Sequence, residues 1–104
     1  MTDRVYLVKA AFLKALSHPL RLQIMELLCR GEQSVGQCTR VFKVDQPTIS
    51  RHLGILKQGG FVEARQKGVS VVYKIRNSGI VNFLGQFGTF ETQTAGRSGA
   101  VKGC

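Results

Sequence analysis

Four side chains that form hydrogen bonds lie close together within residues 45–53, whose sequence is DQPTISRHL: Gln46, Thr48, Ser50 and Arg51. An amide, two hydroxyls and a guanidinium can each donate to a phosphate oxygen or to the edge of a base. Six consecutive positions span less than two turns of helix, so one short helix can carry all four groups. These residue types and this spacing therefore favour contact with a nucleic acid.

The same stretch predicts the helix that would position these groups. Asp45 is suited to the N-cap, because its carboxylate can accept from the backbone N–H groups of the first turn, and Pro47 lies where a missing N–H is harmless. Ile49, Leu53 and Leu56 recur at helical spacing and predict one buried stripe. At about 100° per residue the Arg51 side chain falls almost opposite that stripe.

The charge of the chain supports a polyanionic partner. The 104 residues include 15 Lys and Arg against 6 Asp and Glu, a formal net charge of +9, and 43% of them are hydrophobic, which indicates a folded basic domain. Residues 40–76 contain eight basic and two acidic side chains, and so carry six of the nine net positive charges in about a third of the chain. A solvated basic face is the alternative interpretation of such an excess.

Three further helices are expected before this stretch. Apolar spacing predicts an amphipathic helix over residues 4–16, and Pro19 ends it and is suited to the first turn of the next helix. Residues 20–29 are apolar nearly all round, so we expect this second helix to form the buried centre of the domain. Ser34 can cap a short third helix over residues 35–42. The third helix and the DQPTISRHL helix then form a helix-turn-helix unit.

A hairpin is predicted after the fourth helix. Residues 61–65 and 69–75 are two β-prone runs, and Gly68 between them can take the positive φ that a tight turn needs. A hairpin that directly follows the DNA-reading helix of such a unit is called a wing. Arg65 and Lys67 would place positive charge against phosphates or in the adjacent minor groove.

The chain is expected to end with one more helix and a tail. Ile80, Phe83, Leu84 and Phe87 lie on one side of a final predicted helix. We therefore expect a mostly α fold with a β-hairpin wing, in the order α-α-α-α-β-β-α. Residues 1–90 would form one winged helix-turn-helix domain for DNA binding and dimerisation, and residues 91–104 a flexible Gly- and Ser-rich tail that ends in Cys104.

Over roughly residues 10–76 the sequence resembles the ArsR/SmtB family of winged-helix repressors. The resemblance is carried by ALSHPLRLQIMELL and by DQPTISRHLGILKQGGFVEARQKGVSVVYKI, in this order and spacing. It implies a homodimer that binds a double-stranded DNA operator near a promoter and is released when an effector binds. By position, it implies DNA contacts from Gln46, Thr48, Ser50, Arg51 and His52, with support from Lys67 in the wing.

Two of these positions allow another interpretation. His52 flanks the buried stripe, so it would either contact DNA or only pack and hold a backbone group. Asp45 departs from the serine that is commoner in the family at this turn, and its negative charge close to phosphate favours capping over DNA contact.

The resemblance also implies that the first and last helices form the dimer interface. Their apolar faces are larger than a core of about 70 residues needs. The expected interface residues are Val5, Val8, Phe12, Ile80, Phe83, Leu84 and Phe87.

The metal sites that occur in this family have no ligands here. Metal-sensing members carry Cys-Val-Cys at the start of the third helix, where this chain has Ser34-Val35-Gly36, and residues 77–90 contain no Asp, His, Glu or Cys. The remaining thiols, Cys29, Cys38 and Cys104, could bind As(III) or a soft metal ion, or form a disulfide or persulfide switch. The alternative is that Cys29 and Cys38 only fill the core. Apart from an As(III) or soft metal ion at these cysteines, the sequence indicates no cofactor.

The leading expectation is a repressor controlled by an effector, and the alternative is a constitutive or architectural DNA-binding protein. An enzyme is not supported, because the chain has no Gly-rich phosphate loop and no pair of acidic residues spaced for catalysis. The sequence has neither a signal-like segment nor a stretch of ~20 apolar residues, and its three cysteines do not form a disulfide framework. We therefore expect a cytoplasmic protein without a membrane partner.

Overall fold

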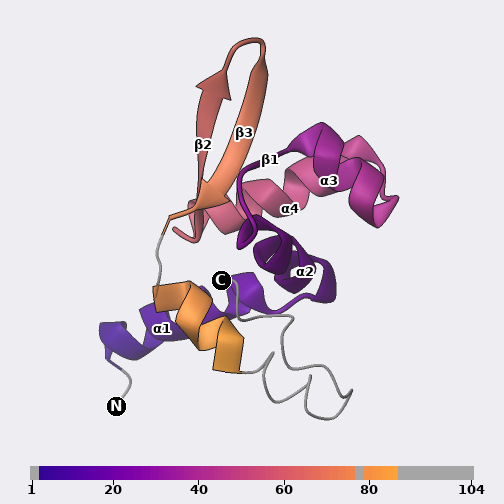
Figure 1. Cartoon of the computed structure of the whole chain (residues 1–104). Helices are drawn as coiled ribbons and strands as arrows, with labels where there is room; N and C mark the ends of the chain where they lie inside the picture. Colours follow the sequence, from indigo (N-terminus) through magenta and orange to yellow (C-terminus); the bar gives the residue numbers. More distant parts are fainter. Residues whose placement is uncertain (1–2, 77–78, 87–104) are drawn as a thin grey trace.

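The computed structural model describes residues 3–76 and 79–86. Its elements are α1 (Arg4–Leu16), α2 (Pro19–Leu28), β1 (Gln33–Ser34), α3 (Val35–Phe42), α4 (Gln46–Gln58), β2 (Val62–Lys67) and β3 (Ser70–Ile75), and residues 79–86 form a last helix. The β2–β3 hairpin extends away from the helices at one end of the molecule, and α1 and the last helix lie towards the other end (Figure 1). The expected mostly α fold with a hairpin wing is confirmed. The predicted tail and Phe87 lie outside the described residues.

Local hydrogen bonds determine where the helices begin and end. At α2, Nδ1 of His18 accepts from the backbone N–H of Leu20 at 3.0 Å. At α3, Oγ of Ser34 accepts from the N–H of Gln37 at 3.1 Å, while Oε1 of Gln37 accepts from the N–H of Ser34 at 2.7 Å, which is a capping box. Helix α3 ends at Phe42, and the left-handed φ of 55° at its C-cap, Lys43, turns the chain towards α4.

The three strands form an antiparallel sheet in the order β1-β3-β2. Gly68 has a φ of +64° in the two-residue turn of the hairpin, as expected. Strand β2 reaches Lys67, two residues beyond the predicted run. Strand β1 was not predicted, because its two residues are held only by pairing with β3, with Gln33 opposite Tyr73.

One hydrophobic core joins the helices to the base of the hairpin. Helix α2 packs against α4 and β3 and buries Ile24, Met25 and Leu28. The expectation that this helix would form the buried centre is wrong for Leu22, which is exposed. The buried residues of the core are Leu16, Ile24, Met25, Leu28, Cys38, Ile49, Leu53, Leu56, Phe61, Val62 and Ile80.

Candidate DNA-binding surface

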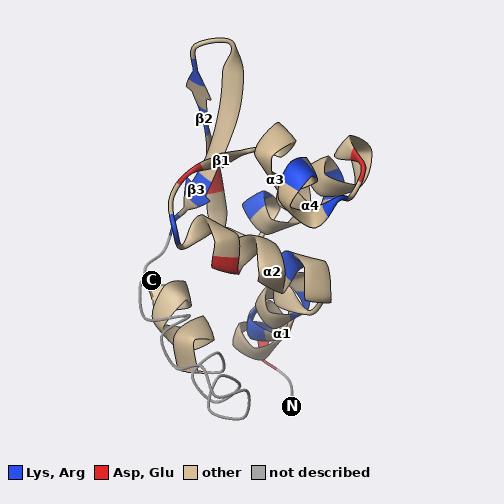
Figure 2. Cartoon of the chain, turned by 45° about the vertical axis from the view of Figure 1, so that its right-hand side comes forward, with Lys and Arg blue, Asp and Glu red and all other residues tan. Residues whose placement is uncertain are grey.

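Helix α4 has one buried face and one exposed polar face. Ile49, Leu53 and Leu56 are fully buried against the core. Gln46, Ser50 and Arg51 are all exposed, so an approaching partner can reach them. The helix packs on α3 through its apolar face, which leaves the polar face at the surface of the helix-turn-helix unit. Lys and Arg residues occur on both helices and on β2 (Figure 2).

Asp45 holds the N-terminus of α4, as its residue type predicted. Its Oδ2 accepts from the backbone N–H of Thr48 at 3.2 Å, and its Oδ1 accepts from the Thr48 hydroxyl at 2.8 Å. These hydrogen bonds, first that from the hydroxyl, hold the pKa of the Asp45 carboxyl below its usual value. The Thr48 hydroxyl proton is therefore engaged by Asp45, and its oxygen keeps lone pairs for a donor on DNA.

His52 lies inside the protein and not on the exposed face of α4. Its side chain is 2% exposed, and its Nδ1 accepts from Nε of Arg21 at 3.1 Å. The ring of His18 lies 4.4 Å away, centroid to centroid. The prediction that His52 contacts DNA does not fit this burial, whereas the alternative, a packing role, does. Burial lowers the pKa of His52, and the charges of His18, Arg51 and Arg21 act in the same direction.

Arg21 is a structural residue of this surface to which sequence reasoning assigned no role. Besides its bond to His52, its Nη1 donates to the carbonyl oxygen of Ala15 at 2.8 Å. It therefore joins the end of α1 and the start of α2 to the middle of α4. The sequence contained one signal, because Arg21 lies in the ALSHPLRLQ run that carries the family resemblance.

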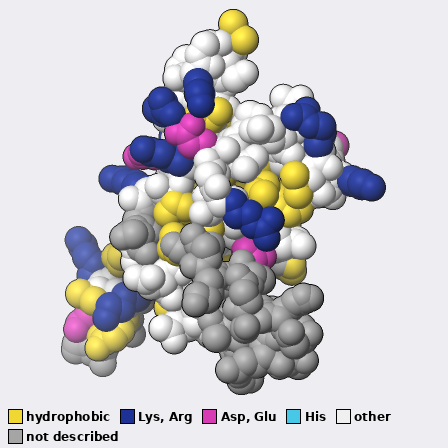
Figure 3. Space-filling view, in the orientation of Figure 1, with side chains coloured by type: hydrophobic (Ala, Val, Ile, Leu, Met, Phe, Trp, Pro, Cys, Tyr) yellow, Lys and Arg dark blue, Asp and Glu magenta, His cyan; other side chains and the backbone are white. Residues whose placement is uncertain are grey.

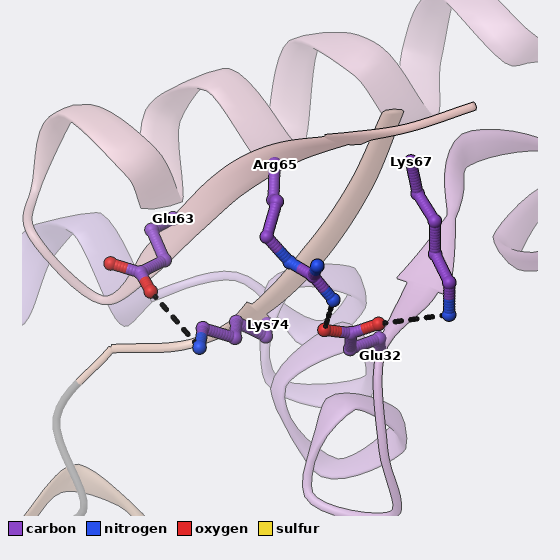
Figure 4. A network of polar contacts seen from close by, with 5 residues as sticks. All are labelled: Glu32, Glu63, Arg65, Lys67 and Lys74. Carbon is purple, nitrogen blue, oxygen red and sulfur yellow. Dashed lines mark hydrogen bonds and ion pairs between the residues drawn. The ribbon is translucent and has the colours of Figure 1, made fainter. Parts of the chain in front are cut away.

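The wing carries the expected cations, but both contact an acidic residue. Arg65 Nη2 donates to Oε2 of Glu32, and Lys67 Nζ lies 3.6 Å from Oε1 of the same carboxylate (Figure 4). The hydrogen bond from Arg65 is the main cause of a lowered pKa at Glu32. Both cations remain well exposed. Sequence reasoning missed Glu32, which comes from the loop before β1.

The expected dimer face is only partly at the surface. Val5 and Val8 on α1 are 55% and 61% exposed, and Phe83 is also exposed. Hydrophobic side chains are visible over α1 at the lower left of Figure 3. Phe12 stacks on the buried Phe61 ring with centroids 4.3 Å apart, and so contributes to the protomer's own packing as well.

Ile80 and Leu84, the other two described interface residues expected from the last helix, pack against the core. The prediction that Ile80 lies in the interface is not supported, because Ile80 is a core residue, 6% exposed. Leu84 is half-buried against the same core.

The two described thiols lie in different environments. Cys38 is fully buried in the core, and this burial raises the pKa of its thiol, which favours the packing role. Cys29 is partly buried and lines a shallow surface pocket of about 490 Å³. Cys104 lies outside the described residues. Within residues 3–76 and 79–86, no three His, Cys, Asp or Glu side chains are grouped closely enough to bind a metal ion, so this part of the chain does not fit a three-ligand site for As(III) or a soft metal.

A helix-turn-helix unit with an exposed polar face on its second helix, followed by a cationic hairpin, defines a winged helix-turn-helix DNA-binding protein. The sequence model of the family described as bacterial regulatory protein, arsR family, matches residues 18–64. The chain belongs to this ArsR family.

Relatives in sequence and structure agree with this assignment. The biofilm growth-associated repressor of Xylella fastidiosa is 41% identical over 66 residues, which cover 64% of this chain and 58% of that protein. The HTH-type transcriptional regulator Rv0081 of Mycobacterium tuberculosis is 34% identical over 84 residues, which cover 80% of this chain and 74% of that protein. Its crystal structure has a TM-score of 0.80 at 30% identity over 91% of this chain and 96% of that one.

A homodimeric winged helix-turn-helix domain of Mycobacterium bovis, Mb0332, has a TM-score of 0.78 at 30% identity, and the match covers 89% of each chain. These relatives carry the names of regulators and repressors and not of enzymes. No helix in the described part of the chain is long and apolar enough to cross a bilayer.

Proposed function

We propose that this protein is a transcriptional repressor that binds an operator in double-stranded DNA through α4 and the wing. The observation that carries this proposal is the arrangement of α4, with Ile49 and Leu53 buried while Gln46, Ser50 and Arg51 are exposed together. A Gln amide matches adenine and an Arg guanidinium matches guanine or a phosphate. The repressor named in Xylella fastidiosa supports the proposal, although the match covers only part of that protein.

Selection of bound duplexes from a random-sequence DNA library tests this proposal. Arg51→Ala should weaken binding to the selected duplex by about five- to a hundred-fold, since a bidentate contact to a base is worth about 1–3 kcal/mol. Lys57→Ala is the matched control, because Lys57 is an exposed cation on the same helix. It should weaken binding to selected and mixed-sequence duplexes alike. Equal affinity for both duplexes at every salt concentration would instead support the architectural alternative.

We propose further that the repressor acts as a homodimer whose interface includes α1. The exposed apolar side chains of Val5 and Val8 support this, as does the homodimeric state in the name of the Mycobacterium bovis neighbour. Val8→Glu should lower the sedimentation coefficient from the value of a dimer to that of a monomer. Val69→Glu is the matched control, because Val69 is 100% exposed at the turn of the wing, far from α1. A parent protein that sediments as a monomer would refute this part.

We propose that an effector lowers operator affinity, and that a thiol-reactive effector would act at Cys29 and Cys104. The partial exposure of Cys29 supports this, whereas the burial of Cys38 speaks against a reactive role for that residue. Arsenite, cadmium ion and a persulfide donor should each be added to the reduced protein on its selected duplex. The double variant with Cys29→Ser and Cys104→Ser should then lose any fall in affinity that these reagents cause, and Cys38→Ser should keep it. No change of affinity with any of the three reagents would rule out thiol sensing.

A further inference from the structure

The acidic residue Glu32 lies on the wing surface that carries the cations. Its two carboxylate oxygens contact different side chains of β2, Oε2 that of Arg65 and Oε1 that of Lys67 at 3.6 Å (Figure 4). Arg65 and Glu32 are 33 positions apart in the sequence, so this contact is made only in the folded protein. One carboxylate thus neutralises part of the charge of two cations.

The sheet register places these groups on one face. Residues directly opposite each other in an antiparallel pair have their side chains on the same side of the sheet. Arg65 lies opposite Val72, and Val72 lies opposite Ser34 on its other side. Glu32 precedes Ser34 by two positions, which is the period of a strand, so it lies on the same side as Arg65. The backbone pairing of β1 with β3 therefore holds the Glu32 carboxylate within reach of Arg65 and Lys67.

A second ion pair of the same hairpin differs in its partners. Glu63 Oε2 lies 3.4 Å from Lys74 Nζ, with one residue on β2 and the other on β3 (Figure 4). Both residues of that ion pair therefore belong to the wing itself. Glu32 instead belongs to the loop between α2 and β1, and it contacts Arg65 and Lys67, the two basic wing residues expected to contact phosphates.

We propose that Glu32 sets the specificity of DNA binding, because its carboxylate competes with phosphate oxygens for Arg65 and Lys67 and so restrains sequence-independent affinity. This inference rests on the proposed DNA-binding function. Phosphate contacts supply essentially all of nonspecific binding, and each phosphate that a cation neutralises steepens the fall of affinity with salt. With Glu32 present, Arg65 and Lys67 contribute less to this attraction than free cations would. Contacts of Gln46 and Arg51 with base edges are not affected by this competition.

The test measures binding to a labelled duplex of mixed sequence over a range of salt concentrations. Glu32→Gln should bind this duplex more tightly than the parent protein. The slope of its plot of log affinity against log salt concentration should be more negative by about one to two. Its affinity for a selected duplex should rise less, so that the ratio of specific to nonspecific affinity falls. Unchanged or weaker binding of the mixed-sequence duplex would overturn the proposal.

A double-mutant cycle separates competition at Arg65 from a general change of charge. Arg65→Gln should reduce the affinity for the mixed-sequence duplex only a little in the parent protein. It should reduce this affinity clearly more in the Glu32→Gln background, because only there is the Arg65 guanidinium free of the Glu32 carboxylate. Equal costs in the two backgrounds would overturn the proposal. Glu63→Gln removes the same charge from a carboxylate that lies on β2 and pairs with Lys74, and it should raise nonspecific affinity less than Glu32→Gln. An equal rise would show an effect of net charge alone and would also overturn it.

The same titrations distinguish the two proposals. A parent protein that binds no duplex at all would overturn both. A parent protein that binds its selected duplex, together with a cycle that shows no coupling, would overturn only the role of Glu32. Urea unfolding of each variant, compared with the parent, shows that a changed affinity does not come from a loss of folded protein.

Discussion

Arg21 Nε donates a hydrogen bond to His52 Nδ1 at 3.1 Å, and this contact joins the start of α2 to the middle of α4. The same guanidinium donates to the carbonyl oxygen of Ala15, so one side chain links three helices. Because Nδ1 accepts this bond, the proton of the neutral imidazole is assigned to Nε2. The exposed face of α4 is therefore oriented in part by a residue that lies outside the helix-turn-helix unit.

Arg21→Ala should destabilise the protein, because it leaves a buried acceptor of His52 without its donor. The free energy of unfolding should fall by about 1–3 kcal/mol. Urea unfolding followed by circular dichroism measures this loss. Arg40→Ala is the matched control at an exposed arginine of α3, and it should change the stability by no more than about 0.5 kcal/mol. A loss at position 21 no larger than that of the control would contradict the role of the contact.

Stability should fall as the solution becomes mildly acidic. Burial, followed by the charges of His18, Arg51 and Arg21, lowers the pKa of His52 in the folded state. The unfolded chain keeps the ordinary histidine pKa of about 6.5, so below that pH it binds a proton that the folded state does not. The free energy of unfolding should therefore decrease as the pH falls from about 6.5 towards the lowered pKa of the folded state. Above this range His52 should cause no change of stability with pH.

His52→Asn is the control for this pH dependence. Its Oδ1 can still accept from Arg21, and the amide does not titrate. Unfolding of parent and variant should be compared at several pH values between about 5 and 8, and the parent should lose more stability on acidification. Parallel curves for the two proteins would refute the assignment of this loss to His52.

Asp45 should stabilise α4 by capping and not by its charge alone. Asp45→Ala removes both acceptors that hold the first turn and should cost about 0.5–2 kcal/mol. Asp45→Asn keeps an N-cap acceptor and should cost clearly less. Thermal unfolding of the two variants tests this, and an Asn variant as unstable as the Ala variant would show that the charge was the main contribution.

Gly54 within α4 and Gly59 at its C-cap should respond in opposite directions to substitution by alanine. A Cβ at Gly54 meets no atom within 4 Å, so Gly54→Ala should raise stability by about 0.5–1 kcal/mol through its effect on helix formation. A Cβ at Gly59 would lie 3.1 Å from two carbons of the buried Phe61 ring and 3.2 Å from Cβ of Ala15. Gly59→Ala should therefore lower stability. The two melting temperatures, measured side by side, should fall on either side of the parent value.

Much of the local structure could be predicted from the sequence. Helix α1 spans the residues that its apolar spacing predicted, and Asp45 and Ser34 form the expected caps of α4 and α3. The periodicity of Ile49, Leu53 and Leu56 identified the buried face of α4 correctly, and so the exposed face as well. These features depend on contacts between residues that follow one another at intervals of three or four positions along the chain.

The sequence did not predict which polar side chains form contacts with residues far away along the chain. His52 could equally have faced DNA, and its burial follows from contact with Arg21, 31 positions away. The pairing of Arg65 with Glu32 spans 33 positions and depends on the two-residue strand β1, which no local pattern marks. In the same way, Ile80 belongs to an amphipathic helix whose inner face is chosen by packing against the core.

The sequence by itself determined the order of the predicted elements, the exposed polar face of α4 and the basic character of the wing, because caps, turns and periodicity act between near neighbours. Only the tertiary structure decided that His52 supports α4 from inside and that Glu32 engages Arg65 and Lys67. The physical reason is that burial and ion pairing depend on which distant segments the folded core brings together.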